Sequence, residues 1–307
     1  MRVFVTGIAG CVGSHLAARL LAAGHDLAGI DNLATGRIAN VPAAVHFEET
    51  DVRECGPLLE AWAPDVVVHA AASYRDPNAW REDLAVNAGG TLAVVAASRR
   101  AAVERLIYFQ TSLCYGLDVP GAPLPITEPL APRGSYAVSK TAGELYVLGS
   151  GLDAISFRLA NLYGPRNLSG PVPAFYKRIR EGEPCVVAEA RRDFVYVGDA
   201  VEVFAAAVEG VGAPGVYHVA TGSDWPIGEL FEILTAELGI EAAATRRPLG
   251  PDDVPSILLD PSRTAETFGW EATTELVSGI GEAVEWYDDH GVGDVYTHLR
   301  FEETTAK

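Results

Sequence analysis

Two groups of polar side chains near the middle of the chain have the types and spacing needed for acid–base chemistry. The stretch "SYAVSK" contains Tyr136 and Lys140, four residues apart, so a helix would place both side chains on one face. A lysine ammonium beside a phenol favours the phenolate, which can take a proton from a hydroxyl group. Thr111 and Ser112 follow the apolar run "RLIYF" by one residue, and such a run is typical of a buried strand. Either group alone could be an exposed helical pair or a turn, and only their occurrence with a nucleotide motif favours the chemical interpretation.

That nucleotide motif lies at the N-terminus. "VTGIAGCVGSHL" places Gly7, Gly10 and Gly13 between a predicted strand and a predicted helix, with the spacing G-x-x-G-x-x-G. Glycines let the backbone approach a diphosphate, whose charge meets the N–H groups and dipole of the helix start. Asp31 ends the second predicted strand, 18 residues after Gly13. A carboxylate there hydrogen-bonds the adenosine ribose and repels a 2′-phosphate, so the motif predicts NAD rather than NADP.

The cysteines and histidines do not indicate a metal site or a disulfide framework. Cys11 lies near the predicted helix start, where it is either a thiol of lowered pKa or a small packed side chain. The four cysteines are far apart and are typical of reduced thiols. The seven histidines show no metal-ligand spacing, and His69 at a predicted strand end is expected to pack rather than act as a base. We therefore expect no metal.

The composition predicts a folded acidic protein. The formal charge of −18 disfavours nucleic acid or an anionic membrane as a partner, because both reward clustered Lys and Arg. The N-terminus lacks the pattern of a signal peptide, and no apolar run approaches the roughly 20 residues of a membrane-spanning helix. We expect a cytoplasmic protein.

Apolar strand-like runs alternate with helical patterns through the first half of the chain. This alternation predicts an α/β protein with a Rossmann-type, doubly wound parallel sheet and a smaller α+β C-terminal substrate domain. The helix carrying Tyr136 should end near residue 148, and a long helix is expected over about 80–100. Residues 1–160 with 195–221 are predicted to form the NAD-binding domain, and residues 161–194 with 222–307 the nucleotide-sugar domain. The expected strands include "RVFVTG", "LAGID", "VHFEE", "DVVVHAAA", "RLIYFQTS", "AISFRLAN" and "GVYHVAT".

From about residue 2 to residue 291 the chain resembles the extended short-chain dehydrogenases/reductases, in the NAD-dependent nucleotide-sugar epimerase/dehydratase family. The loop "DNLATG" resembles the version found in UDP-glucose 4-epimerases. The motifs that carry the resemblance are "TGIAGCVG", "DNLATG", "HAAA", "NAGGT", "TSLCYG", "YAVSK", "RLANLYGPR", "RRDFVYVGD" and "DDVPSILLDPSRTAETFGW".

The resemblance implies a role for each matching position. Thr111 would hydrogen-bond the reacting sugar hydroxyl, Tyr136 would be the catalytic base and acid, and Lys140 would tune Tyr136 and hold the nicotinamide ribose. The residues expected to bind the cofactor are Gly7, Gly10, Cys11, Val12, Gly13, Asp31, Asn32, Asp51, Val52, Ala70, Ala71, Asn87, Tyr136 and Lys140. Those expected to bind the substrate are Thr111, Ser112, Asn161, Arg192 and Asp253.

One position departs from the family pattern. Many relatives carry an arginine three residues before the acid that matches Asp253, and this chain has Gly250 there. Arg246 or Arg247 could compensate. Arg192 is expected to hold a dianionic diphosphate, since the protein is otherwise acidic.

The residues after Thr111 indicate which reaction the family resemblance implies. Relatives that dehydrate the sugar carry an Asp-Glu pair at the next two positions, and decarboxylating relatives keep the Glu. This chain has Ser112 and Leu113, and leucine can neither donate nor accept a proton. The pattern predicts a nucleotide-sugar 4-epimerase, in which hydride leaves C4 for tightly bound NAD and returns to the opposite face of the sugar. The substrate is expected to be a UDP-hexose or UDP-hexuronic acid, and the alternative is a dehydratase, decarboxylase or reductase that uses the same 4-keto intermediate.

Relatives often dimerise through the helix carrying Tyr136 and the long helix before it, so a homodimer is expected. The intact Thr111, Tyr136 and Lys140 argue against a non-catalytic NAD-binding protein.

Overall fold

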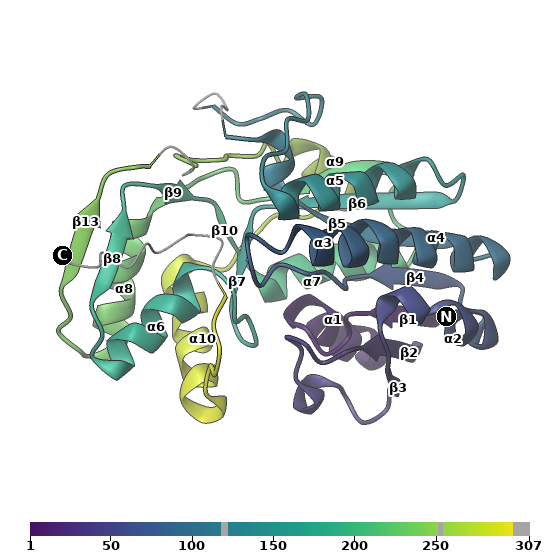
Figure 1. Cartoon of the computed structure of the whole chain (residues 1–307), viewed down its shortest axis with the longest axis horizontal. Helices are drawn as coiled ribbons and strands as arrows, with labels where there is room; N and C mark the ends of the chain where they lie inside the picture. Colours follow the sequence, from purple (N-terminus) through teal and green to yellow (C-terminus); the bar gives the residue numbers. More distant parts are fainter. Residues whose placement is uncertain (118–121, 251–253, 297–307) are drawn as a thin grey trace.

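The computed structural model describes residues 1–117, 122–250 and 254–296, and its centre is a parallel sheet of seven strands (Figure 1). Their spatial order is β3-β2-β1-β4-β5-β6-β11. Strands β1 to β3 are added toward one edge and the strands from β4 onward toward the other edge, so the strand order reverses between β1 and β4. The predicted Rossmann-type, doubly wound sheet is confirmed. The strands are β1 (Arg2–Thr6), β2 (Asp26–Asp31), β3 (His46–Glu49), β4 (Val66–His69), β5 (Arg105–Thr111), β6 (Asp153–Leu159) and β11 (Gly215–Val219).

Helices cover both faces of this sheet. Alternate residues of a strand point to opposite faces. Val3 and Val5 accordingly lie in a buried cluster with α1 and α7, whereas Phe4 lies in a second cluster with α2, α4 and α5. Burial on both faces explains why the inner strands are mainly apolar, whereas β3, at the edge of the sheet, is mostly exposed and polar. The covering helices are α1 (Cys11–Ala22), α2 (Gly56–Trp62), α4 (Thr91–Arg100), α5 (Ser135–Leu148) and α7 (Val197–Val208).

A smaller α+β unit has a hydrophobic cluster of its own, and it occupies the left side of Figure 1. Its strands form three pairs, which are β7 with β10, β8 with β13 and β9 with β12. These strands are β7 (Asn161–Tyr163), β8 (Cys185–Ala188), β9 (Arg191–Arg192), β10 (Phe194–Tyr196), β12 (Trp225–Pro226) and β13 (Ala244–Arg247). Its main helices are α6 (Pro171–Glu181), α8 (Ile227–Leu238) and α10 (Leu276–His290).

The long helix expected over about 80–100 is not one regular α-helix. Between α3 (Trp80–Asp83) and α4 lies a π-helical stretch, η3 (Leu84–Gly90). Within it, the Asn87 side chain bonds the backbone of Ser73, and the Thr91 hydroxyl donates to the Asn87 carbonyl at 2.5 Å. A π-bulge of this kind often marks a functional site, because it turns a side chain out of the regular ladder.

The remaining short elements connect the main ones. A sequence segment beyond residue 222 also packs against the large sheet, since Val254, Leu259 and Trp270 belong to the same cluster as Val3. The division into an NAD-binding domain (1–160 with 195–221) and a nucleotide-sugar domain (161–194 with 222–307) remains a prediction. No helix in the described part of the chain has the length and apolar character to cross a bilayer. The short elements are η1 (Ile38–Asn40), η2 (Val52–Glu54), η4 (Ser112–Tyr115) and α9 (Ser262–Phe268).

Candidate active site

A cavity of about 350 Å³ lies at the carboxyl ends of β1, β2 and β4. Parallel strands end at the same edge of a sheet, so the loops that follow them converge there. The structure brings together most of the residues predicted to bind the cofactor. Those that line the cavity are Gly7, Gly10, Cys11, Val12, Gly13, Asp31, Asn32, Val52, Ala70 and Ala71.

The glycine-rich turn fits a dinucleotide diphosphate. Gly7 has a φ of +70°, and a Cβ there would lie 2.6 Å from the Ala71 nitrogen. A Cβ on Gly13 would lie 2.2 Å from the Gly7 carbonyl oxygen. Helix α1 begins directly after Gly10 without a side-chain cap, so its first N–H groups remain for an anion.

Asp31 is fixed by the backbone of two loops. Its carboxylate accepts from the N–H of Ala9 at 3.0 Å and from the N–H of Leu33 at 2.8 Å. Burial raises the pKa of Asp31, and these backbone bonds act in the opposite direction. The carboxylate is therefore held at the end of β2, where an adenosine ribose would approach.

Cys11 behaves as a packed side chain. Burial raises the pKa of its thiol to about 12, and its Sγ lies 3.7 Å from the Pro165 carbonyl oxygen. The position of Cys11 at the start of this helix therefore does not lower the pKa of its thiol. All four cysteines are free.

Asp51 and Asn87, also predicted to bind the cofactor, do not line the cavity itself. Asp51 caps η2 and forms an ion pair with Arg53 at 2.8 Å, and its hydrogen bonds to Arg53 lower its pKa. Asn87 bonds the backbone of Ser73 and the Ser139 hydroxyl, which links the loop after β4 to α5. Asn87 therefore positions the cavity wall.

Tyr136 and Lys140 lie on α5, which packs against β5. The Lys140 side chain is buried, with 3% of the residue exposed, and its Nζ lies 4.1 Å from the centroid of the Tyr108 ring. Burial lowers the pKa of Lys140 to about 7, and the Glu144 carboxylate acts in the opposite direction.

The phenol of Tyr136 lies in a desolvated environment that holds its proton. Desolvation raises its pKa, and Tyr74 and Asp83 raise it further. The Tyr74 ring meets the Tyr136 ring edge to face, with centroids 6.3 Å apart. Lys140 lies four residues after Tyr136 on the same helix.

Tyr74 was not predicted from the sequence. It lies five residues after the end of β4 and lines the cofactor cavity. Tyr74 follows a strand at the same edge of the sheet as the glycine-rich motif, and this position in the sequence could have identified it.

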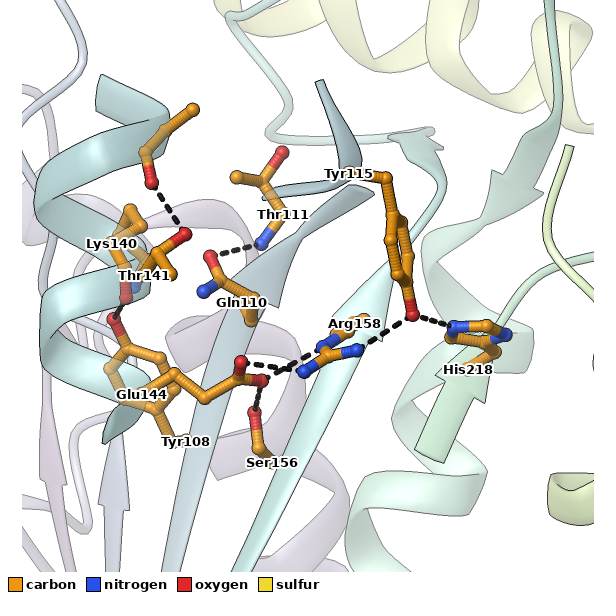
Figure 2. A network of polar contacts seen from close by, with 11 residues as sticks. Tyr108, Gln110, Thr111, Tyr115, Lys140, Thr141, Glu144, Ser156, Arg158 and His218 are labelled. Atoms are coloured by element: carbon orange, nitrogen blue, oxygen red, sulfur yellow. Dashed lines mark hydrogen bonds and ion pairs between the residues drawn. The ribbon is translucent and has the colours of Figure 1, made fainter. Parts of the chain in front are cut away.

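Thr111 and Ser112 lie at the carboxyl end of β5. Figure 2 shows Thr111 at the tip of its strand, with Lys140 on the neighbouring helix. The Thr111 hydroxyl oxygen accepts from the N–H of Leu113 at 3.2 Å and so caps η4. Ser112 is buried, and Leu113 is partly buried against the main hydrophobic cluster.

Two further residues predicted to bind the substrate, Asn161 and Arg192, lie in the smaller unit. The backbone N–H and the side-chain amide of Asn161 both donate to the Asp193 carbonyl. The Arg192 guanidinium donates to the Val254 carbonyl at 2.8 Å, which places β9 beside the segment that begins at Val254. Asp253 itself lies outside the described residues.

Arg246 and Arg247 could compensate for the family arginine that is absent at Gly250, and they differ in their surroundings. Arg246 pairs with Glu232 at 3.7 Å, and both side chains are more than two-thirds exposed. Arg247 donates to the Pro248 carbonyl at 3.2 Å. Arg246 is thus a surface residue of β13 that pairs with α8.

His69 is a structural imidazole. Its two ring nitrogens bond the hydroxyls of Thr6 at 2.7 Å and Thr91 at 2.8 Å, and burial lowers its pKa to about 3. Within the residues placed by the structure, no group of three or more His, Cys, Asp or Glu side chains could hold a metal ion.

A model of the NAD-dependent epimerase/dehydratase family matches residues 3–220. The chain belongs to this family. It is 31% identical to the UDP-glucose 4-epimerase of Mycolicibacterium smegmatis, covering 94% of this chain and 98% of that protein. Relatives named dTDP-glucose 4,6-dehydratase also match, one from an Actinoplanes species at 30% identity over 94% of this chain and 98% of its own length.

Two solved structures from Bordetella bronchiseptica are more similar in sequence. The enzyme WbmH in complex with NAD⁺ is 44% identical, with a TM-score of 0.91, covering 94% of this chain and 99% of WbmH. WbmG in complex with NAD and UDP is 40% identical, with a TM-score of 0.89, covering 98% and 99%. The chain is therefore an extended short-chain dehydrogenase/reductase of the nucleotide-sugar epimerase/dehydratase type, and the predicted cofactor, NAD, is confirmed.

Proposed function

We propose that this protein is an NAD-dependent nucleotide-sugar 4-epimerase that acts in the cytoplasm on a UDP-linked hexose or hexuronic acid. The observation that carries the proposal is the end of β5, where Thr111 is followed by Ser112 and Leu113. Leu113 packs against the main hydrophobic cluster and offers no proton donor. Elimination of water from an oxidised sugar needs an acid at this strand end, so epimerisation is the chemistry that these side chains favour.

A buried carboxylate elsewhere does not replace the missing acid. Asp83 lies close enough to raise the pKa of Tyr136. It belongs to α3, however, and accepts from the hydroxyl of Ser73, a residue that lines the cofactor cavity. Asp83 thus holds a residue of the cofactor cavity in place from behind.

The proposed roles follow from the hydrogen-bonding capacity of each group. NAD, when bound, accepts a hydride from C4 of the sugar and returns it. Tyr136 takes the proton of the C4 hydroxyl and later gives it back. Lys140 in its ammonium form favours the phenolate. The Thr111 oxygen accepts from Leu113, so its hydroxyl hydrogen is available to donate to the sugar oxygen.

An epimerase must keep its cofactor through both hydride transfers, and aromatic contacts near the cavity favour such retention. Tyr296, near the C-terminal end of the described chain, packs edge to face on Tyr74 with centroids 6.0 Å apart. The Arg75 guanidinium lies 4.9 Å from the centroid of the Tyr296 ring and donates to the Ala34 carbonyl. Tyr74, Arg75 and Ala34 all line the cavity, so Arg75 joins two of its loops and Tyr296 packs on one of them.

The choice of a UDP-linked substrate rests on similarity and charge. WbmG, 40% identical, has been solved with UDP, and Arg192 supplies a cation at the predicted diphosphate position. Sugar identity depends on pocket shape, where one substituent changes binding by only about 1–3 kcal/mol.

We further propose a homodimer formed through α4 and α5. Large apolar side chains are exposed on these neighbouring helices, and such a patch marks an association surface. Replacing Leu145, the most exposed of them, with Asp should convert the dimer to a monomer in light scattering. A wild-type monomer would refute the proposal. The exposed side chains are Leu92, Val138, Leu145, Tyr146 and Leu148.

The reaction is tested by incubating the protein with UDP-glucose, UDP-glucuronic acid and their N-acetyl forms while following the ring protons by NMR. A new H4 signal with changed axial–equatorial coupling, at unchanged mass, is expected for one of them. Loss of water or loss of carbon dioxide would instead establish the dehydratase or the decarboxylase, and reduction of a 4-keto sugar with consumption of added NADH would establish the reductase.

A further inference from the structure

A buried polar network lies beneath the catalytic helix (Figure 2). Glu144, one turn after Lys140 on α5, is fully buried and forms an ion pair with Arg158 of β6, whose side chain is 7% exposed. The guanidinium donates to both carboxylate oxygens, at 2.8 and 3.1 Å, and the Ser156 hydroxyl adds a third bond at 2.7 Å. The charge of Glu144 is thus held in one orientation.

The network continues from Arg158 to the end of η4. The third guanidinium nitrogen of Arg158 donates to the Tyr115 hydroxyl oxygen at 2.7 Å, and that hydroxyl lies 2.5 Å from Nε2 of His218. The other ring nitrogen, Nδ1, lies 2.9 Å from the carbonyl oxygen of Asp260. A carbonyl can only accept, so Nδ1 carries the hydrogen and Nε2 accepts from Tyr115. Burial lowers the pKa of His218 to about 4, which agrees with this neutral imidazole.

Tyr115 is the last residue of η4, and Thr111 caps the start of the same turn. The network therefore clamps η4 to α5 through Arg158 and Glu144, and α5 carries Tyr136 and Lys140. We call the residues Glu144, Arg158 and Tyr115 the brace.

We propose that the brace sets the position of the Thr111 hydroxyl relative to Tyr136, and that Tyr115 is a positioning residue for the reaction. This inference rests on the proposed epimerase function, since it assigns Thr111 and Tyr136 to one reacting hydroxyl. A buried ion pair by itself is weak evidence for stability, because desolvation offsets its attraction. Directional bonds that join two catalytic elements instead fix a geometry, and a displacement of about 1 Å can cost roughly 100-fold in rate.

The test compares Tyr115→Phe with a matched control. Tyr217→Phe also removes one hydroxyl from a buried tyrosine, one that donates to the Ala213 carbonyl at 2.9 Å outside the brace. We expect both variants to lose similar stability. Only Tyr115→Phe should lower kcat, by about 10–100-fold, with KM and bound NAD unchanged.

Crystal structures of the wild type and Tyr115→Phe supply a measurement that does not depend on activity. The separation of the Thr111 and Tyr136 hydroxyl oxygens should change by at least about 0.5 Å. An unchanged separation, a kcat equal to that of Tyr217→Phe, or parallel losses in KM and NAD content would overturn the inference. If Tyr115→Phe does not fold, Ser156→Ala weakens the same brace from its other end and should lower kcat about 3–10-fold.

The two proposals fail separately. A wild-type protein that epimerises no nucleotide sugar refutes the function. The change in oxygen separation still decides whether the brace positions Thr111.

Discussion

The cofactor cavity and the predicted substrate site are built in different ways. The cofactor residues are held by loops at one edge of the sheet, Gly7 by its left-handed backbone and Asp31, at the end of β2, by the N–H groups of Ala9 and Leu33. The substrate residues depend on contacts between distant segments, such as the bond from Arg192 to the carbonyl of Val254, 62 residues away. Short motifs can therefore specify the cofactor, whereas the substrate site takes shape only when the smaller unit has folded.

The two regions should accordingly respond independently to substitution, except at the catalytic helix between them. Variants in the cofactor cavity should change NAD content without changing UDP affinity. Variants in the smaller unit should do the reverse.

The largest effect is expected where both regions meet. Tyr136→Phe removes the group that takes the C4 proton, so kcat should fall about 1,000-fold. NAD content after denaturation and UDP affinity by calorimetry should match the wild type. Residual activity above a tenth of the wild-type rate would contradict the assignment of Tyr136 as the base.

In the cofactor cavity, Asp31→Ala should weaken NAD binding about 10–100-fold and relax discrimination against NADP. The carboxylate both bonds the ribose and repels a 2′-phosphate. Fluorescence titration of cofactor-free protein with NAD and NADP measures both effects. A loss of UDP affinity of similar size would show that the two regions are not independent.

In the smaller unit, Arg192→Ala should raise KM for the nucleotide sugar roughly 10-fold, because a charge-assisted bond to the diphosphate is lost. NAD content should not change. Steady-state kinetics gives KM, and Arg246→Ala is the control, since Arg246 is exposed and paired with Glu232. Equal effects of the two variants would remove Arg192 from the predicted site.

The smallest effect is expected on stability, at Lys140. Its pKa in the folded protein, about 7, lies below the ordinary 10.5. Between these pH values the unfolded chain holds a proton that the folded chain lacks, so the free energy of unfolding rises with pH. Lys140→Met should therefore be more stable than the wild type at pH 7, by on the order of 1 kcal/mol or more, with the difference shrinking toward pH 10.

Urea denaturation at several pH values measures this difference. A Lys140→Met protein that is less stable at pH 7, or whose difference does not depend on pH, would show that burial of the ammonium carries no cost.

The contrast between the regions also explains what the sequence could predict. All seven strands of the large sheet were expected. Burial on both faces makes the inner strands apolar runs bounded by turns, whereas β3, at the edge of the sheet, is mostly exposed. Strands β8 and β13 were missed. "ATRR" is a polar segment that becomes a strand only by pairing with Cys185–Ala188, about 60 residues earlier. Such pairing is a tertiary effect that local propensity does not contain.

Prediction of the active-site residues from the sequence has the same limit, because contacts between distant segments are not visible in local patterns. Tyr136, Lys140 and the glycine turn follow from spacing along one helix or one loop. The bond between Glu144 and Arg158 joins a helix to a strand, and the contact of Tyr74 with Tyr136 joins a loop to a helix. The π-helical stretch that carries Asn87 was also invisible to a periodicity that predicts a regular helix.

The most direct test of the account follows the hydrogen on C4. The UDP-sugar found to react would be prepared with deuterium at C4 and incubated with the enzyme, and product and cofactor would be examined by NMR and mass spectrometry. The account predicts a C4 epimer of unchanged mass that keeps deuterium at C4, with no NADH in solution. A product lighter by one water, or deuterium recovered in released NADH, would contradict it.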